Sequence, residues 1–268
     1  MKINTLLHIT KVFLAAVLFT TSSYAQDFSA ARTPANEDLG SVVVEQQDDY
    51  SLSYKKRRSR HGALFSLGFE KFYPLDYRSL YNDSYTYIED IIGEEPLDLV
   101  GAELGYKLNL ALISMAFLGS YSSGGILGAV GASERSLKIN RTGLSVNFAL
   151  DALFEEPWVV PYAQVGAHQL SIRETNGATN DSKSATAAVA VNYRYGLLLQ
   201  LDWLENAFDK SAQADRLRSS GLENTYVDFY IAEHLASAKA IDPGKITNIG
   251  DPNLRSSGEL GLGLKMEF

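Results

Sequence analysis

The sequence predicts an all-β fold, a single eight-stranded antiparallel transmembrane β-barrel, from three observations. Residues 1–25 have the layout of a secretory signal. Several later segments alternate apolar and polar residues with the period of a strand. After the signal, no segment is apolar for long enough to form a membrane-spanning helix: the longest, 108–118, is about half the required length and contains Asn109 and Ser114.

The export signal is predicted from charge, apolar length and a cleavage motif. Two lysines precede or flank a short apolar run at 12–20, and residues 23–25 (Ser-Tyr-Ala) fit a small-x-small cleavage site. The alternative, a membrane-anchoring helix, needs a longer run. Gln26 rather than cysteine follows the site, so a lipid-anchored lipoprotein is not expected.

Composition excludes several function classes. The chain has 24 basic and 32 acidic residues, and without the two signal lysines the net charge falls from −8 to −10. An acidic protein without a clustered basic face is a poor candidate for binding nucleic acid. The absence of cysteine excludes disulfides and thiolate metal sites.

Three regions follow from this layout: the signal peptide at 1–25, a polar N-terminal arm at 26–62 and the barrel at 63–268. The arm is rich in small and polar residues and ends in a basic run at 55–60. Charge runs of this kind are usually solvated. The arm is therefore expected to lie in the periplasm, disordered or loosely held.

The clearest strand covers 258–268, where apolar and polar residues alternate strictly. Period two places each set on one face of a strand. The apolar face carries Leu260, Leu262, Leu264, Met266 and Phe268, and the other carries Glu259, Gly261, Gly263, Lys265 and Glu267.

The same alternation recurs along the barrel region. It is clear at 63–73, 100–108, 141–151 and 186–201, and weaker at 111–122, 158–173 and 224–235. Together with the last strand these segments make eight, an even number as a closed antiparallel barrel needs. Each is long enough to cross a bilayer at a tilt of about 45°.

The connections show the asymmetry of a membrane barrel, with long outer loops and short inner turns. The outer loops are predicted at 75–96, 123–137, 174–184 and 236–257, and the glycines at 124, 125, 128 and 131 are interpreted as part of a flexible outer loop. The first loop is acidic and rich in tyrosine and is expected to be solvated; the alternative is a loop that binds a divalent cation or bridges through cations to lipopolysaccharide phosphates. Inner turns are predicted near Asn109 and at 154–157, and a short periplasmic helix at 202–221.

The last strand resembles the C-terminal signal of outer-membrane barrels. In that family the final residue is aromatic, a hydrophobic residue stands two before it and a glycine five before it; Phe268, Met266 and Gly263 fill these places. Gly261 stands where the family usually has a polar residue. The resemblance implies recognition by the barrel-assembly machinery. With the signal and the alternating strands, the chain resembles the small eight-stranded barrels grouped with OmpA and OmpW.

The alternation predicts an interior that holds charges of both signs. An eight-stranded barrel is just wide enough to be filled by its side chains, and unpaired buried charges are costly, so paired networks and a lumen closed to ions are expected. An ion path is the alternative. Glu103 and Lys107 are candidate partners. The predicted interior set is Glu70, Glu103, Lys107, Arg141, Asp151, Arg194, Asp228, Glu259 and Lys265.

No catalytic, metal or cofactor site is predicted. His168 stands three residues before Ser171, so alternation places the two on opposite faces of a strand rather than together as a catalytic pair. Nucleophile-elbow, zinc-protease and phosphate-loop motifs are missing from the sequence.

These observations predict a non-enzymatic protein of the cell outer membrane with a structural or passive role, which the OmpW-like resemblance extends to passage of small hydrophobic molecules. The expected partners are outer-membrane lipids, lipopolysaccharide and, during biogenesis, the barrel-assembly machinery. Two alternatives stay open: a lipid-modifying enzyme, and a surface adhesin or receptor that acts through its outer loops.

Overall fold

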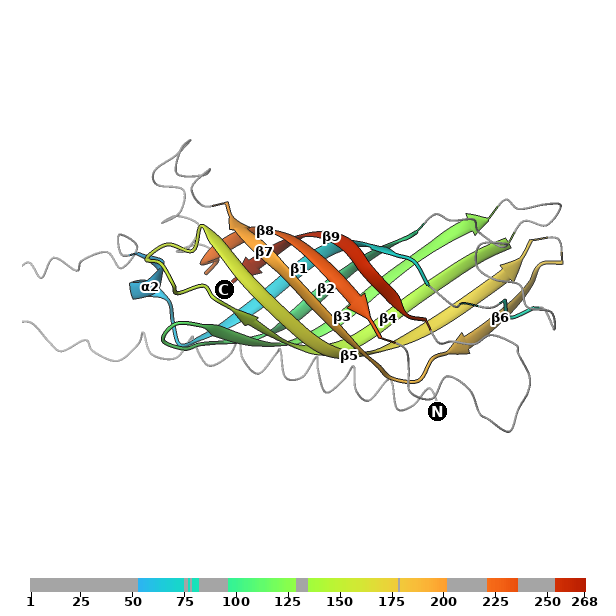
Figure 1. Ribbon diagram of the computed structural model, residues 1–268, viewed down its shortest axis with the longest axis horizontal. Helices are drawn as coiled ribbons and strands as arrows, with labels where there is room; N and C mark the ends of the chain where they lie inside the picture. The colour runs from blue at the N-terminus through green and yellow to red at the C-terminus, as the bar shows by residue number, and fades with distance from the viewer. Residues whose placement is uncertain are drawn as a thin grey trace, which may run out of the picture. The chain divides into compact units, whose positions relative to one another are not determined.

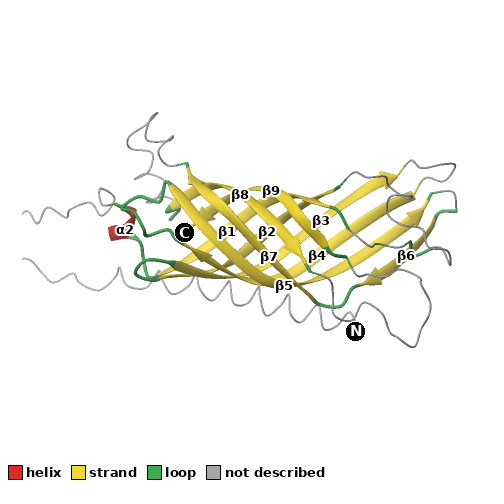
Figure 2. Ribbon diagram, viewed as in Figure 1, coloured by secondary structure: helices red, strands yellow, loops and turns green. Residues whose placement is uncertain are grey.

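A computed structural model describes residues 53–74, 77, 79–81, 96–128, 135–177, 179–201, 221–235 and 254–268, apart from the side chains of 127 and 128. Most of these residues lie in strands (Figure 2). The predicted signal peptide, most of the arm and all but the last residue of the predicted helix at 202–221 lie outside the described residues.

The strands form one closed antiparallel sheet (Figure 1). Consecutive strands pair except β6 and β7, which both pair with β5 and so occupy one position in the wall, and β9 pairs with β1. The predicted eight-stranded barrel is therefore confirmed. The strands are β1 (His61–Phe72), β2 (Leu97–Asn109), β3 (Ser114–Gly128), β4 (Arg135–Ala149), β5 (Val159–Asn176), β6 (Asp181–Thr186), β7 (Ala190–Gln200), β8 (Asn224–His234) and β9 (Ser256–Glu267).

Two predicted outer loops are wrong in extent. β3 continues to Gly128 and β4 begins at Arg135, and β5 and β6 leave only 177–180 between them. The glycines at 124, 125 and 128 therefore lie in a strand rather than in a flexible loop. A reason is visible at Gly124, where a Cβ atom would lie 2.0 Å from the Asp98 carbonyl oxygen; glycine lets β2 and β3 approach closely here.

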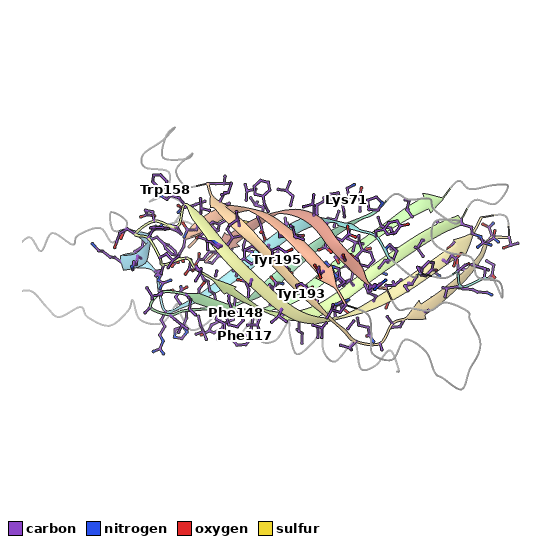
Figure 3. All side chains as sticks on the ribbon, viewed as in Figure 1. Lys71, Phe117, Phe148, Trp158, Tyr193 and Tyr195 are labelled. Carbon is purple, nitrogen blue, oxygen red and sulfur yellow. The ribbon has the colours of Figure 1, made fainter. Side chains whose placement is uncertain are left out.

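A belt of apolar side chains surrounds the half of the barrel nearest α2, the short helix Tyr54–Arg57. Leu144 on β4 is 65% exposed and Leu260 on β9 is 66% exposed. Figure 3 shows Phe117 and Phe148 outside the barrel and Trp158 at the α2 end. An outward apolar band with aromatic residues near its edge is the surface of a membrane barrel.

Beyond this belt the polarity of the wall is reversed. The outward side chains become polar, as at Asn140, Lys138 and Arg173, while the interior becomes apolar. This far part therefore has the pattern of a water-soluble barrel, with polar side chains outside and apolar side chains inside. Its core is formed by Phe72, Leu97, Leu99, Leu137, Ile139, Leu170 and Ile172, with Tyr77, Ala187 and Leu254 from connecting segments.

Residues 53–60 close the α2 end of the barrel. Tyr54 of α2 is fully buried, and Arg58 reaches Asp151 at 3.0 Å. The expectation of a loosely held arm is wrong for this part, because the side chain of Tyr54 supplies an aromatic stopper that composition alone does not reveal. Within the described residues, no helix has the length and apolar character needed to cross a membrane.

Candidate functional site

The candidate site is the charged interior of the barrel, which has three layers. The first lies at the α2 end around Lys107. Its ammonium group contacts the carboxylate of Glu267, lies 2.7 Å from Asp151 Oδ2 and donates to the Tyr54 hydroxyl at 3.0 Å. All four side chains are buried. One cation thus joins β2, β9 and residues 53–60, which close the α2 end.

Tyr54 completes this layer as a donor. Its hydroxyl donates to Glu267 Oε1 at 2.8 Å. Burial raises the pKa of Tyr54 well above its usual range, and the nearby Glu267 and Asp151 carboxylates raise it further. The hydroxyl therefore stays protonated, and the α2 end is closed by a continuous set of charge-assisted hydrogen bonds.

The second layer crosses the middle of the lumen around Glu70. Arg141 donates to both Glu70 carboxylate oxygens, at 2.7 and 3.2 Å. His234 Nε2 lies 2.8 Å from Glu70 Oε1, and Arg194 Nη2 lies 3.5 Å from Oε2. Glu70 is 2% exposed, so β1, β4, β7 and β8 meet in a buried ionic centre.

Glu103 extends this layer toward α2. It accepts from Arg194 Nη1 at 3.3 Å, Gln164 Nε2 at 3.2 Å and Ser66 Oγ at 3.3 Å. The predicted candidate pair of Glu103 with Lys107 is wrong. Both residues face inward from β2, but Glu103 meets Arg194 of β7, and Lys107 meets Glu267 of β9 and Asp151 of the segment after β4, because the register across the sheet decides which charges meet.

Three further residues of the predicted interior set lie outside these two layers: Lys265 and Asp228 contact each other, and Glu259 lies nearer the rim. Lys265 Nζ lies 3.4 Å from Asp228 Oδ2 and 4.3 Å from the centre of the Tyr162 ring, a cation–π contact. Glu259 is half-buried and accepts from the Tyr73 backbone N–H at 3.0 Å, with no cation partner among the contacts of the described residues.

The third layer, at the far end, was not predicted. Glu174 is fully buried and accepts from the Tyr77 hydroxyl at 3.0 Å, the Ser79 hydroxyl at 2.8 Å and the Leu80 backbone N–H at 2.7 Å. Arg135 Nη1 lies 3.3 Å away. The first outer loop was expected to be solvated, which is wrong for Tyr77 and Leu80: Glu174 holds them in the barrel mouth.

Some residues of the site had a signal in the sequence and others had none. Glu267 and His234 share the inward alternation of Lys265 and Asp228, so their faces were readable. Tyr54 and Arg58 lie outside the strands, where alternation gives no orientation. His168 is buried and Ser171 is exposed, as their spacing predicted.

Little free space crosses these layers. A cavity of about 30 Å³, more than the roughly 10–15 Å³ that one water molecule needs, lies between Glu70, Glu103 and Arg141. Among the described residues no group of three metal-binding side chains converges. The interior is a filled ionic core, and its chemistry is that of mutual charge compensation.

One carboxyl at the α2 end gives a pH-dependent prediction. Burial, and then the nearby Glu267 carboxylate, raises the pKa of Glu223 to about 7. Folding therefore favours protonated Glu223. Its contribution to the free energy of unfolding is complete below the ordinary pKa near 4.5 and is lost as the pH rises through 7. Glu223→Gln should resist urea better than the wild type at pH 8, with little difference at pH 4.5. A gain of the same size at both pH values would contradict it.

No family model matches the chain, and no curated protein matches it. Among solved structures, the attachment invasion locus protein Ail of Yersinia pestis matches with 11% identity and a TM-score of 0.39, covering 78% of this chain and 97% of that one. Neisserial surface protein A matches with 14% identity and a TM-score of 0.40, covering 78% and 98%. The N-terminal β-barrel domain of Pseudomonas aeruginosa OprF matches with 16% identity and a TM-score of 0.38, covering 77% and 99%. The strand pairing of this chain independently confirms the small-barrel fold expected from its sequence.

Proposed function

We propose that this protein is an outer-membrane β-barrel with a lumen closed to ions, which serves the envelope as a structural element. The observation that carries the proposal is the ionic centre at Glu70, where side chains from four strands meet across the lumen. The apolar belt on a closed sheet supports insertion into a bilayer, and together with the export signal it supports the outer membrane.

Orientation follows from the same features. β1 begins and β9 ends on the α2 side of the barrel (Figure 1). The short described turn 110–113 lies on the same side. This side is assigned to the periplasm, and the rim formed by β3 to β6 is assigned to the exterior.

The interior favours a structural role over transport of small hydrophobic molecules. The apolar outer half is occupied by its own side chains, including Phe72, Tyr77 and Leu254. Within the belt the eight strands each pair with both neighbours, so the described strands offer no gap toward the lipid there; beyond the belt, β6 pairs only with β5. The lipid-modifying alternative gains no support, because His168 and Ser171 lie on opposite faces.

Conductance in planar bilayers tests the proposal. The purified protein should first migrate differently in gels before and after boiling, which shows a folded barrel. In bilayers it should give small or no conductance, because the Glu70 layer blocks the lumen. Tyr54→Ala, which removes only the stopper at the α2 end, should stay closed for the same reason. Large, stable openings of the wild type would refute the closed lumen.

A further inference from the structure

The outward face of β4, β5 and β6 carries a cationic patch beyond the apolar belt. Lys138 and Arg173 are directly opposite in the register of β4 and β5, and both are exposed. Like charges in this arrangement are destabilising unless an anion lies between them. Neither cation has a carboxylate partner among the described residues. The patch comprises these two cations with Ser136, Asn140, Ser171, Thr175, Ser182 and Ser184, which are uncharged hydrogen-bonding residues on the same face.

The lack of a described carboxylate partner for these two cations contrasts with the acidic character of the chain. The whole protein has 32 acidic against 24 basic residues. Elsewhere near the upper edge of the belt, Lys71 lies 2.6 Å from Asp98, and Glu233 bonds to Tyr193. Of the described acidic residues of β5 and β6, Glu174 points into the barrel, and Asp181 alternates onto the same face of the sheet as Glu174. The patch is therefore a local positive surface on an acidic protein.

Its height fits the polar layer of a membrane. Lys138 lies six residues beyond Leu144 on the same face of β4. At about 3.3 Å per residue and a tilt of about 45°, Lys138 is roughly 14 Å farther from the bilayer centre. Thr142 and Asn140 separate the two, so the cations lie beyond the acyl chains and beside the headgroups.

We infer that this patch binds the phosphate groups of lipopolysaccharide in the outer leaflet. Two cations on adjacent strands match a phosphorylated sugar headgroup, and the surrounding hydroxyl and amide groups can hydrogen-bond to sugar and phosphate oxygens. The acyl chains of the same lipid would cover the apolar side chains below, such as Leu144 and Val165. The inference rests on the proposed location in the outer membrane and adds a lipid partner for one side of the barrel.

The test measures binding of bisphosphorylated lipid A to the folded full-length mature protein in detergent, by native mass spectrometry. Each cation near an anionic lipid surface contributes about 1 kcal/mol, about fivefold, so Lys138→Gln/Arg173→Gln should bind about 30-fold more weakly. The matched control is Lys71→Gln, whose ammonium group is already paired with Asp98 and whose loss should leave binding unchanged. Dephosphorylated lipid A should bind the wild type about as weakly as the double variant binds the phosphorylated lipid.

Three results would overturn the inference: equal binding by the double variant, equal binding of dephosphorylated lipid A, or displacement of lipid A by millimolar inorganic phosphate, which would indicate a site for the free anion. The gel shift of each variant on boiling reports folding separately. A wild type that does not fold as a membrane barrel would refute the proposed function, whereas folded variants with undiminished binding would refute only the lipid site.

Discussion

Replacement of Glu70 with leucine is expected to lower the free energy of unfolding by about 3–5 kcal/mol, because it leaves buried cations without their counterion. Arg141 would lose both of its bonds to Glu70 and keep only its contact with His234 Nε2 at 2.8 Å, and His234 would lose its contact with Glu70. Arg194 would keep Glu103 as a partner. The loss is therefore concentrated on Arg141, which is 7% exposed and has little access to water.

A double variant separates charge imbalance from loss of packing. Glu70→Leu/Arg141→Met removes both members of the bidentate pair and should be less destabilised than Glu70→Leu, because no uncompensated charge stays buried between them. Urea unfolding in lipid vesicles, followed by tryptophan fluorescence, gives both values. Lys71→Met is the exposed control and should cost less than about 1 kcal/mol. A double variant at least as unstable as the single one would show that the ionic centre does not control stability.

The ionic centre also shows what the sequence could predict. Alternation gave the inward facing of Glu70, Glu103 and Arg141, because a strand has only two faces. It could not give their partners, because these depend on strands far apart in the chain and on register. Glu70 on β1 meets Arg141 on β4, which is not a neighbouring strand, and this contact exists only once the barrel has closed.

The far end of the barrel was less predictable for a different reason. Alternation shows that the two faces of a strand differ, but it does not show which face meets lipid. Around 135–140 the outward face is polar and the inward face apolar, the reverse of the belt below. Polar outward residues and glycines gave this segment the composition of a loop, although its backbone is paired throughout. Stopper residues such as Tyr54 have no periodic neighbours and are placed only by tertiary contacts.

Gly261 departs from the usual pattern of a last strand, and the structure supplies a reason. Gly261 lies directly opposite Tyr230 on β8, and a Cβ atom at position 261 would lie 2.0 Å from the tyrosine ring. The ring therefore lies flat over the glycine, where it contacts the Arg194 guanidinium at 4.0 Å and its hydroxyl donates to the Phe69 carbonyl at 3.4 Å. Gly261 thus makes room for a side chain that supports the ionic centre.

Gly261→Val is accordingly expected to destabilise the barrel by about 3 kcal/mol. Overpacking a filled core costs about 1–3 kcal/mol, and displacement of Tyr230 would also lose a buried cation–π contact with Arg194, worth up to about 2 kcal/mol. Tyr230→Ala removes the ring with which valine collides. In that background Gly261→Val should cost much less, so the two changes should be strongly non-additive in a double-mutant cycle of urea unfolding. Additive effects would contradict this account. They would mean that the backbone of β9 itself requires Gly261, whether or not the Tyr230 ring is present.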